Sequence, residues 1–227
     1  MAGYGQFCPV AKAMEILDER WTLLIVRELL MGSRHFNELR RGVPRMSPAL
    51  LSTRLRSLER NGVLTRIDEG GRPAYQLTAC GSDLLDVVNG LGRWGLTWAT
   101  ELGDEDLDPQ LLLWDIRRSI PVAAWPGDRT TVALSFRDVP GRGAHWWVVV
   151  AGGEADICDV DPGFPVAVTV TTSLRALTRI WRGELAWARA IRTGVVDLHG
   201  PAAVRRRVPG WFGQSLLARA ARASGAP

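Results

Sequence analysis

The stretch Arg45–Gly62, RMSPALLSTRLRSLERNG, contains both a helix-start and a helix-stop signal. Ser47 is a favourable N-cap residue, and Pro48 suits the first helical position. Gly62 can end a helix in the left-handed backbone conformation, which residues with a side chain adopt less readily. The sequence therefore predicts a helix that begins after Ser47 and ends before Gly62.

This predicted helix has two unlike faces. Leu51, Leu55 and Leu58 recur at i, i+4 and i+7 and form an apolar stripe. The opposite face carries small, hydroxyl and basic residues: Ala49, Thr53, Arg56, Ser57 and Arg60. Such a face suits the major groove of DNA, because small residues permit close approach, hydroxyl and guanidinium groups read base edges, and neighbouring arginines hold phosphates. A solvated amphipathic helix would show the same pattern.

Three further helices are predicted upstream, over residues 9–17, 19–31 and 35–41, before a turn at 42–44. On the first of them, Val10, Met14 and Leu17 are spaced for burial. Apolar residues of the second cover more than one face, which is typical of a core helix: Trp21, Leu24, Ile25, Leu29 and Leu30. A helix, a tight turn and a Ser-capped amphipathic helix follow the helix-turn-helix order.

A hairpin is predicted directly downstream. Strands at 63–67 and 74–77 flank the tip DEGGRP at 68–73, and Thr78 caps a long helix that runs toward Leu102. Arg66 and Arg72 lie on the hairpin, where a basic wing reaches the minor groove or its flanking phosphates. An ordinary solvated hairpin is the alternative.

Composition places limits on the kind of protein. A chain of 227 residues with 46% hydrophobic and 23% charged residues is typical of a globular protein with two domains. The net charge is only +4, but the segment from Arg34 to Arg66 holds eight arginines against Glu38 and Glu59. This local excess of positive charge is consistent with a nucleic-acid partner.

Signals of catalysis, metal binding and membrane insertion are weak. The cysteines, Cys8, Cys80 and Cys158, are odd in number and widely separated, so neither a disulfide framework nor a zinc site is predicted. The histidines are also far apart, and no phosphate loop or nucleophile elbow is present. We expect no enzyme activity, no cofactor and no metal. With no signal segment and no run near the ~18 apolar residues of a membrane span, we expect a cytoplasmic protein without membrane insertion.

The first half resembles the winged helix-turn-helix domain of the HxlR-type transcriptional regulators, which are related to the MarR group. The segments that carry the resemblance are CPVAKAMEILDERWTLLIVRELLMG from Cys8, HFNELRRGVPRMSPALLSTRLRSLERNGVLTR from His35 and YQLTACGSDLLDVVNGLGRWG from Tyr75. The resemblance implies a DNA-binding and dimerisation domain over residues 1–103. It also implies a homodimer that pairs through the N-terminal helix and the helix after the wing. Such a dimer would bind a palindromic operator in double-stranded DNA, with half-sites about 34 Å apart.

The residues that we expect to contact DNA lie on the predicted second helix of the motif and on the wing: Arg45, Ser47, Ala49, Ser52, Thr53, Arg54, Arg56, Arg66 and Arg72. Several members of the resembling family sense oxidants through a cysteine at the position that Cys8 matches. Cys8 precedes Pro9 at a helix start, where the helix dipole and Lys12 would favour a thiolate. An inert, half-buried residue is the alternative for Cys8.

The composition changes after the acidic linker GDEDLD at 103–108. Seven of the ten tryptophans follow it, and strands are predicted at 130–136, 145–151, 155–160, 165–172 and 195–198. Helices are predicted at 111–120, from 173 to 181, up to 192 and after 201. We expect an α+β domain over residues 109–227, with an antiparallel sheet packed on helices.

This second half resembles the sterol-carrier-protein-like fold between Gln110 and Trp211. The pieces that carry the resemblance are VAVTVTT, SLRALTRIWRGE, LAWARAIRTG, VVDLHG and PAAVRRRV. The resemblance implies a hydrophobic cavity for a lipid-like or other apolar effector. Its expected lining is Trp146, Trp147, Ile180, Trp181, Trp187 and Trp211. Aromatic residues at these spacings are also compatible with an ordinary core.

The sequence thus predicts a dimeric DNA-binding regulator, a repressor, whose second domain binds a hydrophobic small molecule that modulates DNA binding. Two alternatives stay open. In one, the protein is an apolar-ligand carrier that uses the winged domain for dimerisation. In the other, it is a thiol-based redox regulator that acts through Cys8.

Overall fold

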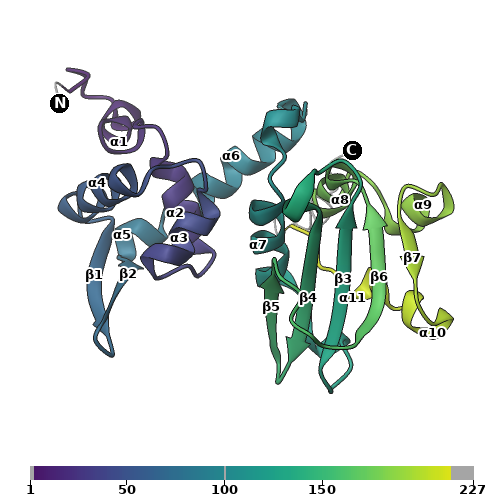
Figure 1. Ribbon diagram of the computed structural model, residues 1–227. Coiled ribbons are helices and arrows are strands. Elements are labelled where there is room, and N and C mark those ends of the chain that lie inside the picture. Colours follow the sequence, from purple (N-terminus) through teal and green to yellow (C-terminus); the bar gives the residue numbers. More distant parts are fainter. Residues whose placement is uncertain (1–2, 100, 216–227) are drawn as a thin grey trace. The chain divides into compact units, whose positions relative to one another are not determined.

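The computed structural model describes residues 3–99 and 101–215. The chain divides into two compact units, Met1–Ala99 and Thr100–Pro227 (Figure 1). Residues 216–227 of the predicted second domain lie outside the described ranges. Within the described residues, no helix has the length and apolar character that a membrane span requires.

The first unit is a winged helix-turn-helix. Its elements in chain order are α1 Pro9–Leu17, α2 Thr22–Leu30, α3 Phe36–Gly42, α4 Pro48–Arg60, β1 Leu64–Glu69, β2 Arg72–Leu77, α5 Ala79–Ser82 and α6 Leu85–Trp98. Helix α4 lies within the predicted limits. The Ser47 hydroxyl oxygen accepts a hydrogen bond from the Leu50 amide at 3.3 Å, and Gly62 has a φ of +70°.

The core of the first unit lies between α2, α3 and α4. Leu51, Leu55 and Leu58 are all buried, as the stripe on α4 predicted, and they pack with Ile25 and Leu39. Apolar side chains from three helices are thus buried together in one core, away from water. The face of α4 opposite this stripe is left toward solvent.

Two predictions of burial in this unit are wrong. Helix α1 has the predicted limits but contains no buried residue, and Val10 is 69% exposed. Leu24 of α2, expected in a helix buried on more than one face, is 41% exposed. Periodicity identifies an apolar face but not the element that covers it, and among the described residues nothing covers these side chains fully.

The wing is longer than predicted because its turn is tighter. Gly70 and Gly71 have φ values of +62° and +84°, the positive values that a two-residue type I′ turn requires at both central positions. Pairing therefore continues to Glu69 and Arg72 on either side of the turn. The side chains of Arg66 and Arg72 are both exposed.

The long helix predicted from Thr78 is divided into α5 and α6, and α6 ends at Trp98. The Leu84 amide bonds the Gly81 carbonyl in a tightened turn between the two helices, at 3.3 Å. Thr78 fixes the start of α5, because its hydroxyl donates to the Gly62 carbonyl at 2.6 Å and accepts from the Gly81 amide at 3.2 Å. The backbone of Gly81 lies directly against Val63.

The second unit is an α+β layout with one sheet. Its elements are η1 Asp104–Asp106, α7 Pro109–Ser119, η2 Val122–Ala124, β3 Thr130–Phe136, η3 Gly141–Ala144, β4 His145–Ala151, β5 Glu154–Cys158, β6 Val166–Thr172, α8 Leu174–Trp181, α9 Trp187–Arg192, β7 Asp197–His199, α10 Ala202–Arg205 and α11 Val208–Trp211. Part of the predicted linker is ordered against this unit, since Arg175 donates to the Leu102 carbonyl and pairs with Asp104, both at 2.5 Å.

The sheet is mixed and not wholly antiparallel. Its strand order is β5-β4-β3-β6-β7, and β3 pairs with β6 in parallel while the other pairs are antiparallel (Figure 1). The expectation of an antiparallel sheet is therefore wrong at the centre. The connections from β3 to β4 and from β4 to β5 join antiparallel neighbours, and the chain then returns past β4 to place β6 beside β3. The sequence gives no local signal for this parallel pairing, because the paired residues are far apart in the chain.

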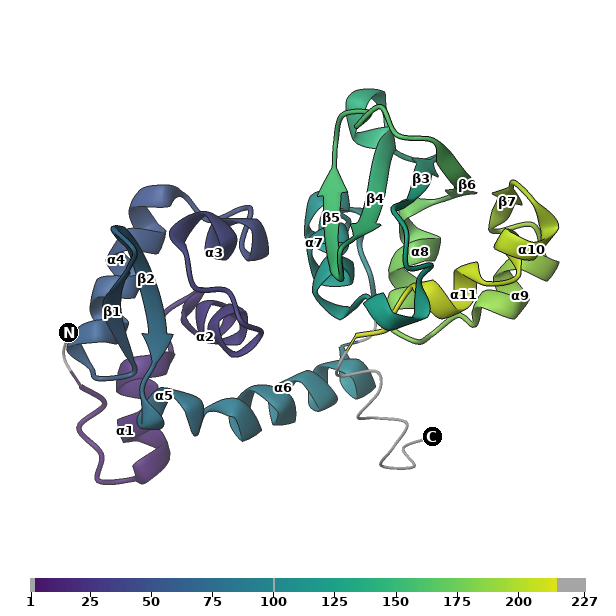
Figure 2. The ribbon, with the colours of Figure 1, turned by 90° about the horizontal axis from the view of Figure 1, so that it is seen from below.

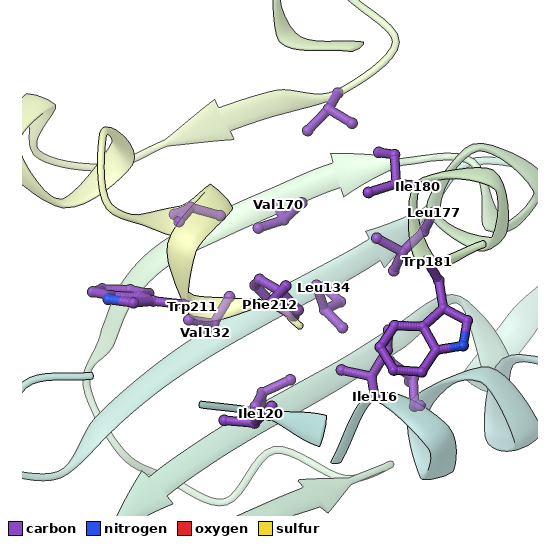
Figure 3. Packing of buried hydrophobic residues seen from close by; sticks show 14 of the residues in the cluster. Ile116, Ile120, Val132, Leu134, Val170, Leu177, Ile180, Trp181, Trp211 and Phe212 are labelled. Atoms are coloured by element: carbon purple, nitrogen blue, oxygen red, sulfur yellow. The ribbon is translucent and has the colours of Figure 1, made fainter. Parts of the chain in front are cut away.

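Helices cover one face of this sheet, as the two views together show (Figures 1 and 2). Alternate residues of the central strands, such as Leu134 and Val170, point to that face and pack with Ile116, Leu177 and Ile180 (Figure 3). The second unit thus has a core of its own.

Candidate nucleic-acid interface and candidate ligand site

Four of the residues predicted to contact DNA stand along the exposed part of α4 and at its start. Ser47, Ala49, Thr53 and Arg56 are all exposed. Arg56 donates from Nη2 to the Thr53 hydroxyl at 3.4 Å, and that hydroxyl donates to the Ala49 carbonyl at 3.0 Å. The Arg56 guanidinium group is thus hydrogen-bonded to a hydroxyl on the exposed face of the helix, the face that a groove would admit.

Arg54 differs from the other arginines of this set. Its guanidinium group is ion-paired with the Glu19 carboxylate, and its Nε donates to the Arg20 carbonyl at 3.3 Å. Only 18% of the Arg54 side chain is exposed. The structure thus ties α4 to the segment before α2 through Arg54. Ser52 is likewise half-buried, whereas Arg45, before the cap, is exposed.

The wing is braced by the segment that leads into α3. Arg34 pairs with Glu69 at 2.7 Å, and its carbonyl accepts from the Tyr75 amide at 2.8 Å. The His35 Nδ1 atom lies 3.1 Å from the Pro73 carbonyl oxygen. These contacts fix the wing, from Tyr75 toward its tip, relative to the segment before α3, and they leave Arg66 and Arg72 exposed. The sequence offered no signal for them, because the partners are about 35 to 40 positions apart.

A buried carboxylate secures the turn between α3 and α4. Glu28 has no exposed surface and pairs with Arg27 at 2.7 Å, while Arg27 also donates to the Gly42 carbonyl at 3.2 Å. A side chain at Gly42 would collide with the Glu28 carboxylate. Sequence reasoning missed this pair, because a glutamate in a helix ordinarily faces solvent.

Cys8 is the half-buried N-cap residue of α1, and its side chain makes no capping hydrogen bond. Lys12, which was expected to favour a thiolate there, instead pairs with Glu15 at 2.9 Å. The hydrogen bond from Lys12 is the main cause that lowers the pKa of Glu15. In the second unit, burial raises the pKa of the Cys158 thiol, and Asp156 and Asp159 add to the effect.

A second surface of the first unit is apolar. Large hydrophobic side chains are exposed on and around α1 and α6: Phe7, Val10, Met14, Leu85, Val87, Leu91, Trp94 and Trp98. Trp94 and Trp98 are 61% and 73% exposed. Exposed apolar side chains gathered on two helices are typical of a protein–protein interface when they form a common surface.

The tryptophans of the second unit gather on the helix-covered side of the sheet. Trp181, Trp187, Trp211 and Ile180 are buried in its hydrophobic core, and Trp146 packs against it. Trp147 lies on the opposite face, because successive residues of β4 alternate and Val148 is buried with the core. Trp147 is thus separated from the other five residues predicted to line a cavity.

Two aromatic residues that the sequence did not single out complete this cluster. Trp125 stacks on Trp211 with ring centroids 4.8 Å apart and donates from Nε1 to the Trp211 carbonyl at 2.9 Å. Phe212 lies 6.1 Å from Trp125 and 5.6 Å from Trp187, centroid to centroid. We call Trp125, Trp187, Trp211 and Phe212 the aromatic cluster. Their positions span 88 residues, so only the fold brings them together.

Among the described residues, no group of three or more His, Cys, Asp or Glu side chains is placed to hold a metal ion.

Known proteins similar to this chain match its first unit. A model of the HxlR-like helix-turn-helix family matches residues 16–102. The HTH-type transcriptional regulator YvaP of Bacillus subtilis is 39% identical over 98 residues, which are 41% of this chain and 91% of YvaP. The regulator sll1512 of Synechocystis is 33% identical over 97 residues, 41% of this chain and 72% of its own. A crystal structure of quinone-bound YodB from B. subtilis shows 30% identity, covers 40% of this chain and 99% of that chain, and has a TM-score of 0.36.

The capped second helix, the two-stranded wing and these relatives together define the class: this is a DNA-binding transcriptional regulator of the winged helix-turn-helix type, and not an enzyme. The chain belongs to the HxlR-like helix-turn-helix family.

Proposed function

We propose that the protein is a homodimeric repressor that binds a palindromic operator, and that its second unit is a sterol-carrier-like domain whose hydrophobic effector modulates DNA binding. In this proposal residues 1–103 bind DNA and dimerise, and residues 109–227 bind the effector. The observation that carries it is the exposed face of α4, on which Arg56 donates to the Thr53 hydroxyl and that hydroxyl donates to the Ala49 carbonyl.

The contacts with DNA follow from the two basic elements of the first unit. Helix α4 enters the major groove, where Arg56 reads a base edge, since guanidinium groups pair bidentately with guanine. Ser47, Ala49, Ser52 and Thr53 line the approach, and Arg45, Arg66 and Arg72 bind phosphates on either side. Arg54 contributes by holding α4 in position through Glu19.

The exposed apolar side chains of α1 and α6 support a dimer. When two copies bury these surfaces against each other, the dimer has two α4 helices. In the proposed complex these helices enter adjacent major grooves on one face of DNA, which are about 34 Å apart. A two-fold arrangement of this kind requires a palindromic operator.

The second unit supports a site for an apolar effector. One face of its mixed sheet is covered by helices, and between these layers lies a core rich in large aromatic rings. The order β6, α8, a Gly-Glu pair at 183–184, α9, Gly194 and β7 follows the sterol-carrier-like pattern. The effector regulates only if it binds the DNA-competent and the DNA-free states with different affinity.

Fluorescence anisotropy with a labelled fragment of the protein's own upstream region tests this function. We expect specific binding that is tighter than binding to shuffled DNA of equal length and that weakens steeply with salt. An equal affinity for both DNAs, or no dependence on salt, would contradict the proposal. If an apolar ligand binds but leaves the DNA affinity unchanged, the carrier alternative is correct. If oxidant releases DNA and Cys8→Ser abolishes this release, the redox alternative is correct.

A further inference from the structure

Two indole N–H groups in the core of the second unit have no hydrogen-bond partner among the residues that the structure describes. They are Nε1 of Trp187 and Nε1 of Trp211, in side chains that are 8% and 2% exposed, respectively. A buried donor without an acceptor loses its hydrogen bonds to water and regains nothing. Buried tryptophans in folded proteins usually find a partner for this group, so the two exceptions call for a physical explanation.

Other tryptophans of the same unit are satisfied by the fold. Trp125 donates to the Trp211 carbonyl at 2.9 Å, and Trp146 donates to the Gly143 carbonyl at 2.8 Å. The chain thus supplies main-chain acceptors to indoles at two positions of this core and its rim. The open donors of Trp187 and Trp211 are both in the aromatic cluster, where Phe212 connects Trp187 to Trp125 and Trp125 stacks on Trp211.

We propose that the aromatic cluster is the effector site and that the effector combines a flat apolar body with a neutral carbonyl oxygen, which accepts a hydrogen bond from Trp187 or Trp211. This inference rests on the proposed effector-binding function and specifies the ligand class. The rings supply apolar area for stacking. The open donors supply the polar contact that fixes the orientation of a ligand in an apolar site.

The charge of the ligand follows from the surroundings of the cluster. The side chains that form this core are apolar, and the guanidinium carbon of Arg207 lies 5.8 Å from the Trp211 ring centroid. Arg207 itself is exposed. A carboxylate buried among these rings would lose its hydration without a buried counter-charge, whereas a ketone, ester or amide carbonyl would not incur that penalty.

A closely packed core admits a ligand only if a ring moves. Phe212 is the candidate, because it follows α11 in an irregular segment and contacts the rings on both sides. The amide of Ser215, three residues on, bonds the Trp181 carbonyl at 3.0 Å and anchors that segment to α8.

Two probes of nearly equal size test the carbonyl requirement: 2-acetylnaphthalene, which carries the acceptor, and 2-ethylnaphthalene, which lacks it. Binding of each to the full chain is measured by isothermal titration calorimetry. We expect the acetyl probe to bind about three- to tenfold more tightly, the range of one neutral hydrogen bond.

Substitution by phenylalanine removes the N–H group and keeps an aromatic ring. In Trp187→Phe, Trp211→Phe and the double variant, the preference for the acetyl probe should shrink, and it should vanish in the double variant. Trp147→Phe, on the other face of the sheet, is the matched control and should retain it. Thermal unfolding followed by circular dichroism establishes that each variant is folded. If the double variant does not fold, the loss of preference in the two single variants tests the proposal.

The outcomes separate this inference from the function on which it rests. If neither probe binds the wild-type chain, the proposed effector function fails. If both bind equally, or if the preference survives loss of both N–H groups, an effector site remains but the assignment of the two donors is overturned.

Discussion

Arg54 of helix α4 is ion-paired with Glu19, which lies in the connection between α1 and α2, and its Nε also donates to the Arg20 carbonyl at 3.3 Å. Both side chains are largely buried, with 18% and 19% of their surfaces exposed. Arg54 of α4 thus faces the protein, while Arg56, two positions on, faces solvent. The two residues should therefore respond differently to substitution.

Removal of either partner of the Arg54 pair should loosen α4. We expect Arg54→Ala and Glu19→Gln each to lower the free energy of unfolding by about 1 kcal/mol, since a partly buried pair exceeds the usual surface value. Both should weaken DNA binding to a similar degree, as measured by anisotropy, and the double variant should be little worse than either. If Arg54 instead bound DNA directly, Glu19→Gln would release it and strengthen binding.

Arg56 and Arg72 should differ in the kind of DNA contact they make. Arg56→Ala should reduce specific binding by about 1–3 kcal/mol and relax discrimination at one base pair, because a bidentate base contact is lost. Arg72→Ala on the wing should weaken binding to all sequences alike and reduce the salt slope by about one. Anisotropy titrations on specific and shuffled DNA at several salt concentrations distinguish these effects. Identical behaviour of the two variants would contradict the division into base and phosphate contacts.

A charge on the apolar face of α6 should dissociate the proposed dimer. Trp94→Glu places a carboxylate in a surface that becomes desolvated on pairing, and the dimer dissociation constant should rise more than tenfold. Sedimentation velocity over a concentration series measures it. Val160→Glu is the control, because Val160 is similarly exposed, at 66%, but lies in the second unit. An unaltered dimer in Trp94→Glu would place the interface elsewhere.

Two glycines of the first unit should not tolerate a methyl group. In Gly42→Ala the new Cβ meets the buried Glu28 carboxylate, and in Gly81→Ala it meets the Val63 carbonyl. Each should lower the free energy of unfolding by about 1–3 kcal/mol in urea titrations, because Gly42→Ala displaces the buried Glu28 carboxylate and Gly81→Ala forces the main chain at Val63 to shift. In Gly210→Ala no atom lies within 4 Å of the added carbon, so the stability should not fall. Destabilisation by Gly210→Ala alone would contradict this account.

Alkylation should distinguish the cysteines of the folded chain. Burial and two neighbouring carboxylates raise the pKa of Cys158, and only the thiolate reacts with iodoacetamide. At neutral pH, Cys158 should therefore be modified more slowly than the exposed Cys80, and its rate should keep rising as the pH increases toward the raised pKa. Mass spectrometry of digested samples follows each site. Equal rates at neutral pH would show that the carboxylates and burial do not protect Cys158.

Several features were correct from sequence because their causes are local. Ser47, Pro48 and Gly62 set the limits of α4, and the spacing of three leucines gave its buried face. The order of elements around this helix then predicted the winged helix-turn-helix, and the resemblance of three segments indicated its family. An N-cap, a turn glycine or a helical period depends on atoms within a few residues, so the sequence contains the information directly.

The remaining features depend on contacts between residues that are far apart in the chain. The ion pair of Arg54 with Glu19, the parallel pairing of β3 with β6 and the close approach of Gly42 to Glu28 leave no periodic signal. Equally, a sequence of apolar residues does not say which ones a partner covers, as the exposed α1 side chains show.

The limits of helix α4, Pro48–Arg60, and its buried stripe thus follow from the sequence alone. Only the tertiary structure decided that Arg54 turns toward the protein while Arg56 remains exposed, and that Trp187 and Trp211 keep donors without partners inside a closed core. Helix limits follow from short-range backbone hydrogen bonding. The partner of a long polar side chain, by contrast, depends on which group from a distant part of the sequence lies close to it in the folded protein.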